Sequence, residues 1–230
     1  MVKVLRLGTR MGFGFATIVL VFTLAILATY INLLELNKEV TLIREFNVPK
    51  VTHASGMRSS MFHMRLAMLR AIITGGLVNK SKNAEDVHRH RAALLDHIAE
   101  FEKLVQLHPF PEELEPLKVI KENLAVIIPF QEQLLNSTEI DEETFAVMSR
   151  HAYIVIENND KIMAFERERI AQRAQLATDE VKATERLFII ALSIGIVLAA
   201  LMSFFMTRSV TQPVEDMRLL WSNWQQRAHK

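Results

Sequence analysis

Two long runs of uncharged residues constrain this chain more than any other feature of its sequence. Residues 11–31 and residues 187–206 contain no Asp, Glu, Lys or Arg. At about 1.5 Å of rise per residue, a helix of either length spans roughly 30 Å, the thickness of the hydrocarbon core of a bilayer. We therefore predict two transmembrane helices. The first run exceeds the ~7–15 apolar residues of a typical signal peptide, which favours an uncleaved anchor.

The residues that flank the two runs predict the orientation in the membrane. Residues 1–10 carry three basic and no acidic residues, and residues 207–230 carry four basic residues against Glu215 and Asp216. Short basic flanks stay on the cytoplasmic side. We expect a two-pass protein of a bacterial inner membrane, with both termini in the cytoplasm and residues 32–186 in the periplasm.

The amino-acid composition limits the fold class and the chemistry that this chain can perform. The chain is half hydrophobic and has only seven Gly and six Pro in 230 residues, which is typical of an all-α protein. It has no Cys, which excludes disulfides and thiolate chemistry. A formal net charge of +1 gives no reason to expect a nucleic-acid partner.

The segment between the membrane helices predicts a four-helix bundle. Turn signals divide it into helices over 33–77, from about Asn83 to the sequence HPFPEE, over 112–135, and from Asp141 onward. Short connections favour an antiparallel up-down-up-down arrangement. On the first of these helices a seam spaced 4,3,4,3, like that of a coiled coil, is predicted to face the bundle or a dimer partner. The seam contains Met57, Met61, Met64, Met68 and Ala71.

The last predicted helix has no Gly or Pro from residue 141 to residue 194, and it runs into the second membrane segment. A continuous helix over 141–206 would be about 100 Å long. Such a rod can carry a displacement from the periplasm through the bilayer.

This architecture resembles the sensor half of bacterial methyl-accepting chemotaxis proteins. Two local motifs add to the resemblance: TRMGFGF at the entry to the first membrane helix and RSVTQPVEDM after the second. The second motif looks like the start of a HAMP linker. The resemblance places Arg208 at the membrane surface, Pro213 at the start of a helix, and Val214 and Met217 at core positions. Only 22 residues follow Arg208, without a Gly, so we expect a partial HAMP-like stub over 207–230 and no output module.

The resemblance also implies a ligand site and a dimer. Related amino-acid receptors bind a ligand carboxylate with arginines of the first periplasmic helix, because Arg pairs with carboxylates through two parallel hydrogen bonds. The alternative reading is that these arginines pair with nearby acidic side chains. The candidate ligand contacts are Arg58, Arg65, Arg70, Thr74, His151, Asn158 and Asn159.

Three functions stay open at this point. The first is a chemoreceptor-type input protein that senses a periplasmic small molecule, with a carboxylate as the best match. The second is the input half of a sensor histidine kinase or a cyclase. The third is a membrane protein without an output that modulates intact receptors by forming mixed dimers. We expect partners to be membrane lipids and a second copy or a related receptor. We expect no enzymatic activity, no metal and no cofactor, because no catalytic or complete ligand set stands out.

Overall fold

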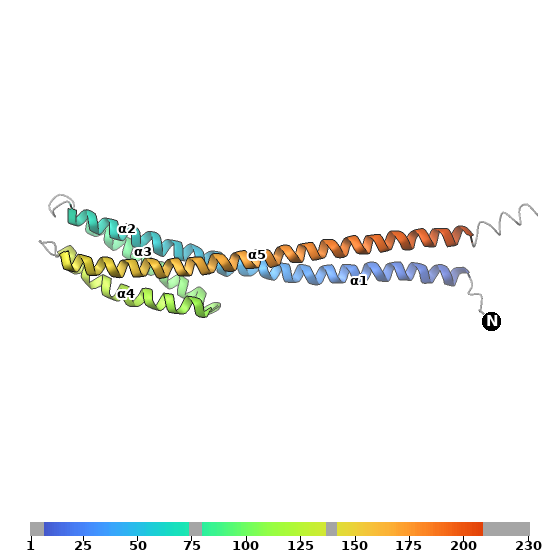
Figure 1. The fold of residues 1–230 in the computed structure, drawn as a ribbon, viewed down its shortest axis with the longest axis horizontal. Helices are drawn as coiled ribbons and strands as arrows, with labels where there is room; N and C mark the ends of the chain where they lie inside the picture. Colours follow the sequence, from blue (N-terminus) through green and yellow to red (C-terminus); the bar gives the residue numbers. More distant parts are fainter. Residues whose placement is uncertain (1–6, 74–79, 137–141, 209–230) are drawn as a thin grey trace, which may run out of the picture. The chain divides into compact units, whose positions relative to one another are not determined.

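The computed structural model describes residues 7–73, 80–136 and 142–208, and within these ranges all regular structure is helical and no strand occurs. The helices are α1 (Leu7–Leu42), α2 (Val48–Ile73), α3 (Lys80–Leu107), α4 (Pro111–Asn136) and α5 (Glu142–Met206), with a π-helical turn η1 (Ile43–Asn47) between the first two (Figure 1). The predictions at Thr74, Pro213, Val214 and Met217 lie outside the described residues, as does the side chain of Ala71.

The chain divides into two compact units, which are described separately. One unit is Lys38–Leu176, and the other combines Met1–Asn37 with Ala177–Lys230. Helix α5 supplies residues to both units, so the predicted uninterrupted helix is confirmed from Glu142 to Met206.

Two helix boundaries differ from the sequence prediction. The helix expected to begin near Asn83 begins at Lys80, and Asn83 is buried within it rather than capping it. The helix expected from residue 112 begins at Pro111. Proline suits the first position of a helix because the N–H that it lacks would have no partner there.

The π-helical turn η1 was not predicted. The N–H of Val48 donates to the carbonyl of Ile43, five residues earlier. Several positions around this turn are partly or fully buried, among them Leu42, Ile43, Phe46 and Asn47. Single π-helical turns of this kind occur as bulges within α-helices, often at functional sites.

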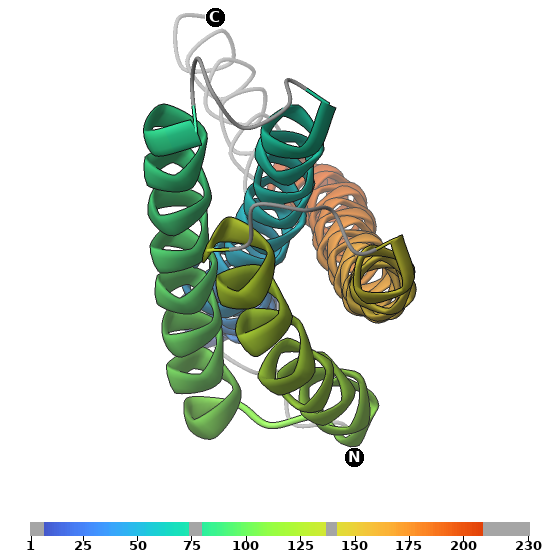
Figure 2. The ribbon, with the colours of Figure 1, turned by 90° about the vertical axis from the view of Figure 1, so that its left-hand side faces the viewer.

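The unit Lys38–Leu176 has one apolar core to which four helices contribute, and Figure 2 shows the start of α5 nearly end-on with α2, α3 and α4 inclined to the line of view. The four methionines of the predicted seam are all buried in it. Thioether side chains are flexible and fill irregular gaps between helices. The largest fully buried apolar side chains are Phe101, Met57, Met61, Met64, Met68, Leu94, Ile120, Ile127, Met148 and Ile162.

The other unit pairs the apolar stretch of α1 with that of α5. Asn32 donates to the hydroxyl of Thr184 at 3.1 Å, and a Cβ at Gly195 would lie 2.8 Å from the ring of Phe22. A Cβ at Gly14 would meet the thioether of Met202. The residue numbers of each pair add up to 216 or 217, so the two stretches run antiparallel in this unit.

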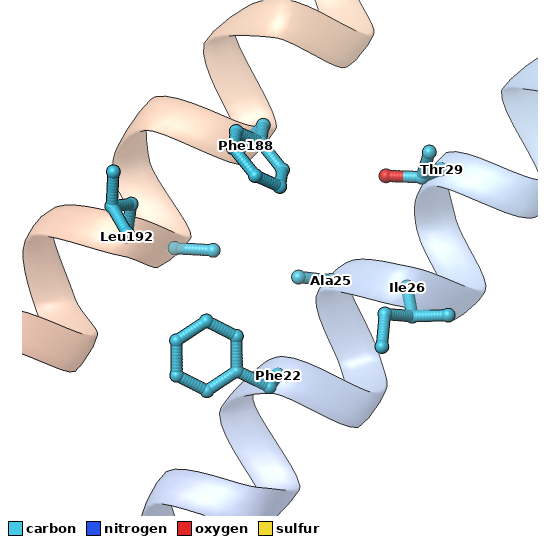
Figure 3. Close-up of a pocket in the computed structure, with 7 residues that line it drawn as sticks. Phe22, Ala25, Ile26, Thr29, Phe188 and Leu192 are labelled. Atoms are coloured by element: carbon cyan, nitrogen blue, oxygen red, sulfur yellow. The ribbon is translucent and has the colours of Figure 1, made fainter.

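Small residues and outward-facing apolar side chains characterise this helix pair. Ala191 and Gly195 are buried, and Figure 3 shows Phe22 and Ala25 of α1 opposite Phe188 and Leu192 of α5. Small residues let membrane helices approach closely. Large apolar side chains such as Phe13, Ile26, Phe188 and Ile196 are mostly exposed. Both helices are long and apolar enough to cross a membrane, as predicted.

Paired cysteines test the antiparallel register, and the absence of native Cys gives a clean background. We expect Ala25→Cys with Ala191→Cys to be joined by a short bifunctional thiol reagent in membranes, because both residues line the same contact between α1 and α5. The matched control is Leu27→Cys with Ala191→Cys, since Leu27 lies at the same level on an exposed face. The measurement is mass spectrometry of the digested protein. Equal crosslinking of both pairs would contradict the register.

Candidate functional site: a buried lysine between two glutamates

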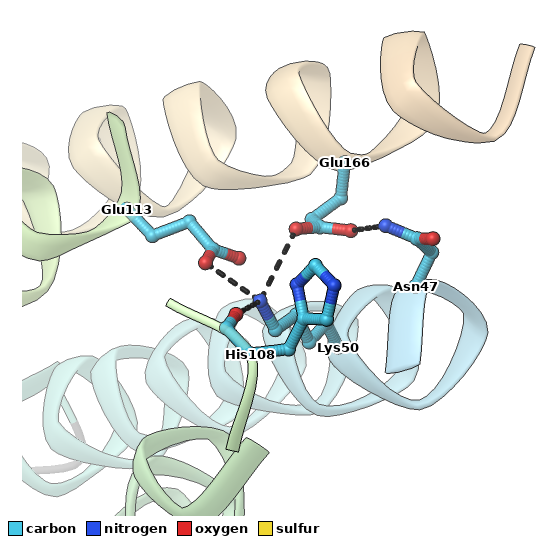
Figure 4. A network of polar contacts seen from close by, with 5 residues as sticks. All are labelled: Asn47, Lys50, His108, Glu113 and Glu166. Carbon is cyan, nitrogen blue, oxygen red and sulfur yellow. Dashed lines mark hydrogen bonds and ion pairs between the residues drawn. The ribbon is translucent and has the colours of Figure 1, made fainter. Parts of the chain in front are cut away.

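The most unusual feature of the unit Lys38–Leu176 is a fully buried ammonium group. Lys50 Nζ donates to Glu113 Oε2 at 2.6 Å and to the backbone carbonyl of His108 at 2.9 Å. Glu166 Oε1 lies 3.7 Å away, and Asn47 Nδ2 donates to Glu166 Oε2 at 2.7 Å (Figure 4). We call these five residues the Lys50 cluster. Lys50, Glu113 and Glu166 are all completely inaccessible to solvent.

Each member of the Lys50 cluster comes from a different place in the chain. Asn47 closes the π turn η1, and Lys50 lies in the first turn of α2. His108 directly follows α3, Glu113 lies in the first turn of α4, and Glu166 lies on α5. The cluster therefore ties α2, α4, α5 and the end of α3 to one point.

The charges of the cluster do not balance if both carboxyl groups are ionised. The pKa of Glu113 is raised to about 8. Burial is the largest cause and a hydrogen bond to Glu166 the second, while Lys50 acts in the opposite direction. Oε1 of Glu113 and Oε1 of Glu166 are buried without any donor. A proton on Glu113, donated to Glu166, satisfies both oxygens and leaves one carboxylate for one ammonium.

Aromatic rings and further cations border the cluster. The ring of Phe110 lies under two cations, with Lys50 Nζ 4.9 Å and Arg169 Cζ 3.7 Å from its centroid. The His108 ring packs between Phe46 and Phe110. Burial, and then the charge of Lys50, lower the pKa of His108, which keeps this imidazole neutral.

This arrangement suits a structural and proton-sensitive role rather than catalysis. Its charged atoms are closed to solvent, so a substrate has no access to Lys50 in this state. Removing one partner of a buried ion pair is strongly unfavourable, because it leaves an uncompensated charge. Movement of α5 relative to α2 or α4 must therefore break or rearrange these contacts together.

The Lys50 cluster was missed at the sequence level, although a signal was present. Lys50 falls four residues before Ala54 and seven before Met57, on the same seam as the methionines. Glu166 falls four residues after Ile162 and seven after Asn159 in the same way. Charged residues at seam positions of two helices indicate buried partners, whereas each helix taken alone suggests a solvated charge.

Two predicted ligand contacts lie on a shared surface of α2 and α5. Arg58 Nε pairs with Asp160 Oδ1 at 3.1 Å, and both side chains are about half exposed. Arg65 donates to the Tyr153 hydroxyl at 2.9 Å, with its guanidinium 4.2 Å from the centroid of that ring. Each of these arginines therefore already uses part of its guanidinium N–H groups in a contact within the chain.

The other predicted contacts do not converge on these arginines. His151 Nδ1 lies 2.7 Å from Asn123 Oδ1 of α4. Asn158 donates to the carbonyl of Ile154 within its own helix. Asn159 is buried and donates to the carbonyl of Ala54 at 2.8 Å. His151 is thus directed to α4, Asn159 to α2 and Asn158 to the backbone of its own helix. Arg70 also makes an interaction.

A surface groove lies beside Arg58. It is lined by Ser55, Arg58, Ser59 and Phe62 of α2 and by Ile156 of α5. A guanidinium, two hydroxyl groups and an apolar wall are the chemistry that a small carboxylate with an apolar side group requires. The groove is open to solvent.

No protein-family model, no curated protein and no solved structure matches this chain.

Replacing Lys50 tests the buried ion pair. We expect Lys50→Met to lower the free energy of unfolding by about 3–5 kcal/mol, because two buried carboxyl groups lose their counter-ion. The control is Lys161→Met, which removes the exposed pair with Glu157 and should change nothing measurable. Thermal unfolding followed by circular dichroism in detergent provides the measurement. Equal stability of both variants would show that the cluster does not hold the helices.

The raised pKa of Glu113 predicts an unusual dependence of the protein's stability on pH. Its pKa is raised in the folded state from an ordinary value of 4.5 to about 8. The folded state therefore binds more protons than the unfolded state between these values, and stability decreases as the pH rises through about 8. We expect Glu113→Gln to flatten this decrease in melting temperature between pH 5 and pH 9. Glu157→Gln, an exposed control, should keep the slope of the wild type. An unchanged slope in Glu113→Gln would contradict the assignment.

Proposed function

We propose that this chain is a two-pass signal-input protein of the chemoreceptor type, which senses a small molecule outside the membrane and transmits a displacement of α5. The observation that carries the proposal is the continuity of α5. One helix supplies core residues such as Met148, Val155 and Ile162 in the unit Lys38–Leu176, and the buried Ala191 and Gly195 in the other unit. A continuous helix shared by a sensor core and a membrane pair would let a displacement pass from one to the other.

Side-chain pairs support an up-down-up-down bundle. His53 meets His97 and His63 meets His90, so α2 and α3 approach each other in opposite directions. Helices α3 and α4 also approach each other in opposite directions. Their paired side chains are Arg91 with Glu132 and Glu102 with Lys121.

The proposed ligand is a small carboxylate, bound in the groove beside Arg58. Its binding would replace the pairing of Arg58 with Asp160, which connects α2 to α5. A ligand shifts an equilibrium only by its difference in affinity between two arrangements. Exchange of an α2–α5 ion pair for a ligand contact supplies such a difference directly at α5.

A homodimer with both termini in the cytoplasm completes the proposal. The stretch that begins at Arg208 would be the HAMP-like entry toward an output module. The four seam methionines are buried within one chain, so a mixed dimer through these side chains would have to open the bundle. The observations therefore favour an input protein that dimerises through its outer surface.

A chimera tests the transmission. Residues 1–208 are joined in frame to the cytoplasmic part of a characterised chemoreceptor, and the phosphorylation rate of the associated kinase is measured in membranes. We expect Ala177→Pro, which breaks α5 between the two units, to abolish control by small carboxylates. Ala177→Leu, the matched control, should retain a response of about 5–150-fold, the usual size of coupling between two sites.

Two outcomes would contradict the proposal. One is kinase activity that is the same in the parent chimera and in Ala177→Pro under every condition tested. The other is a response to carboxylates that persists unchanged in Arg58→Ala, which would remove the groove from the proposal.

A further inference from the structure

Two histidines from neighbouring helices direct the same ring nitrogen at each other. Nδ1 of His53 on α2 lies 3.3 Å from Nδ1 of His97 on α3, and the ring centroids are 5.5 Å apart. Both side chains are half-buried, so small ions have access to them. In the metal-free pair one Nδ1 carries hydrogen and the other accepts it.

The separation of the two nitrogens matches that of ligands around a tetrahedral metal ion. Zinc–imidazole bonds are about 2.0–2.1 Å long, and a tetrahedral angle between two of them places the nitrogens roughly 3.3–3.4 Å apart. The observed separation of 3.3 Å equals this spacing, and turning the two rings toward a common point would complete the geometry. To bind a metal ion through both Nδ1 atoms, the ring that donates in the metal-free pair moves its hydrogen from Nδ1 to Nε2 through exchange with water. Both rings are then neutral, with the hydrogen on Nε2 and a free lone pair on Nδ1.

We propose that His53 and His97 form a binding site for one divalent ion of the zinc class, which bridges α2 and α3. No group of three or more His, Cys, Asp or Glu side chains in the described part of the chain is arranged to hold a metal. The site therefore supplies two protein ligands, and water occupies the remaining positions. Imidazole ligands suit Zn(II), Ni(II) and Cu(II) and disfavour Mg(II) and Ca(II).

Gly56 positions the imidazole of His97. A Cβ at Gly56 would meet this ring, so the ring rests on the backbone of α2 one turn after His53. Only a residue without a side chain allows His97 to approach α2 this closely. Gly56 therefore has a role that the helical periodicity does not explain.

The second histidine pair of the same interface lacks this geometry. His63 and His90 stack face to face, with centroids 5.1 Å apart and an interplanar angle of 19°. Nδ1 of His63 is already engaged with the carbonyl of Ser59 at 2.8 Å. Stacked rings direct their lone pairs sideways rather than toward a common point, so this pair serves as an internal control.

Zinc titration of the full chain in detergent tests the site, with isothermal calorimetry as the readout. We expect one Zn(II) per chain in the wild type. His53→Phe and His97→Phe keep an aromatic ring but remove the lone pair, and each should weaken binding by more than about tenfold. His63→Phe with His90→Phe should bind like the wild type. Gly56→Ala keeps both imidazoles and should weaken binding by displacing His97.

Several results would overturn the proposal. They are no zinc binding by the wild type at millimolar zinc, unchanged binding in both His53→Phe and His97→Phe, or loss of binding in the His63/His90 control. Co(II) substitution gives a second readout, because a tetrahedral site shows intense visible absorption that an octahedral surface ion lacks. The proposed signalling function does not depend on this site, so either proposal can fail alone.

Discussion

The burial of the Lys50 ammonium group is the constraint on which the unit Lys38–Leu176 depends. Taking a charge out of water is unfavourable by several kcal/mol even after the protein relaxes, unless its hydrogen bonds are replaced. The replacements come from the carbonyl that follows α3, from Glu113 on α4 and from Glu166 on α5. Apolar surfaces alone allow two helices to shift along each other by one turn. The hydrogen bonds of Lys50 form only in one relative position of the helices. The cluster thus fixes the register that the core fills.

The helix pair of the other unit follows different physics. Its large apolar side chains face outward, and its contact surface contains small residues such as Ala191 and Gly195. In lipid, apolar burial does not drive helices together, so close packing and hydrogen bonds such as that from Asn32 to Thr184 decide the association. Helix α5 contributes to both units, and its inward positions keep a spacing of three and four residues from Met148 to Thr184 and again from Ala191 to Met202.

Local patterns predicted most of the helices and little of the site. The methionine seam, the absence of Gly and Pro in α5, and the charge-free runs each act within one helix, and each was read correctly as helical. The π turn was missed because residues 43–47 contain no Gly or Pro that would mark an irregularity within a helix. The Lys50 cluster was missed because Asn47 and Glu166 are 119 residues apart, and periodicity within a helix says nothing about such a pairing. Arg58 was singled out by its residue type rather than by its position, and its contact with a ligand stays a prediction.

The methionine-filled core has a chemical consequence of its own. Oxidation converts a thioether into a polar, chiral sulfoxide, which a packed apolar core cannot accommodate without disruption. In the folded bundle Met57, Met61, Met64 and Met68 are at most 1% exposed, so an oxidant reaches them only when the helices separate. The rate at which these sulfurs are oxidised thus records how often the bundle opens. Once oxidised, they would prevent it from closing again.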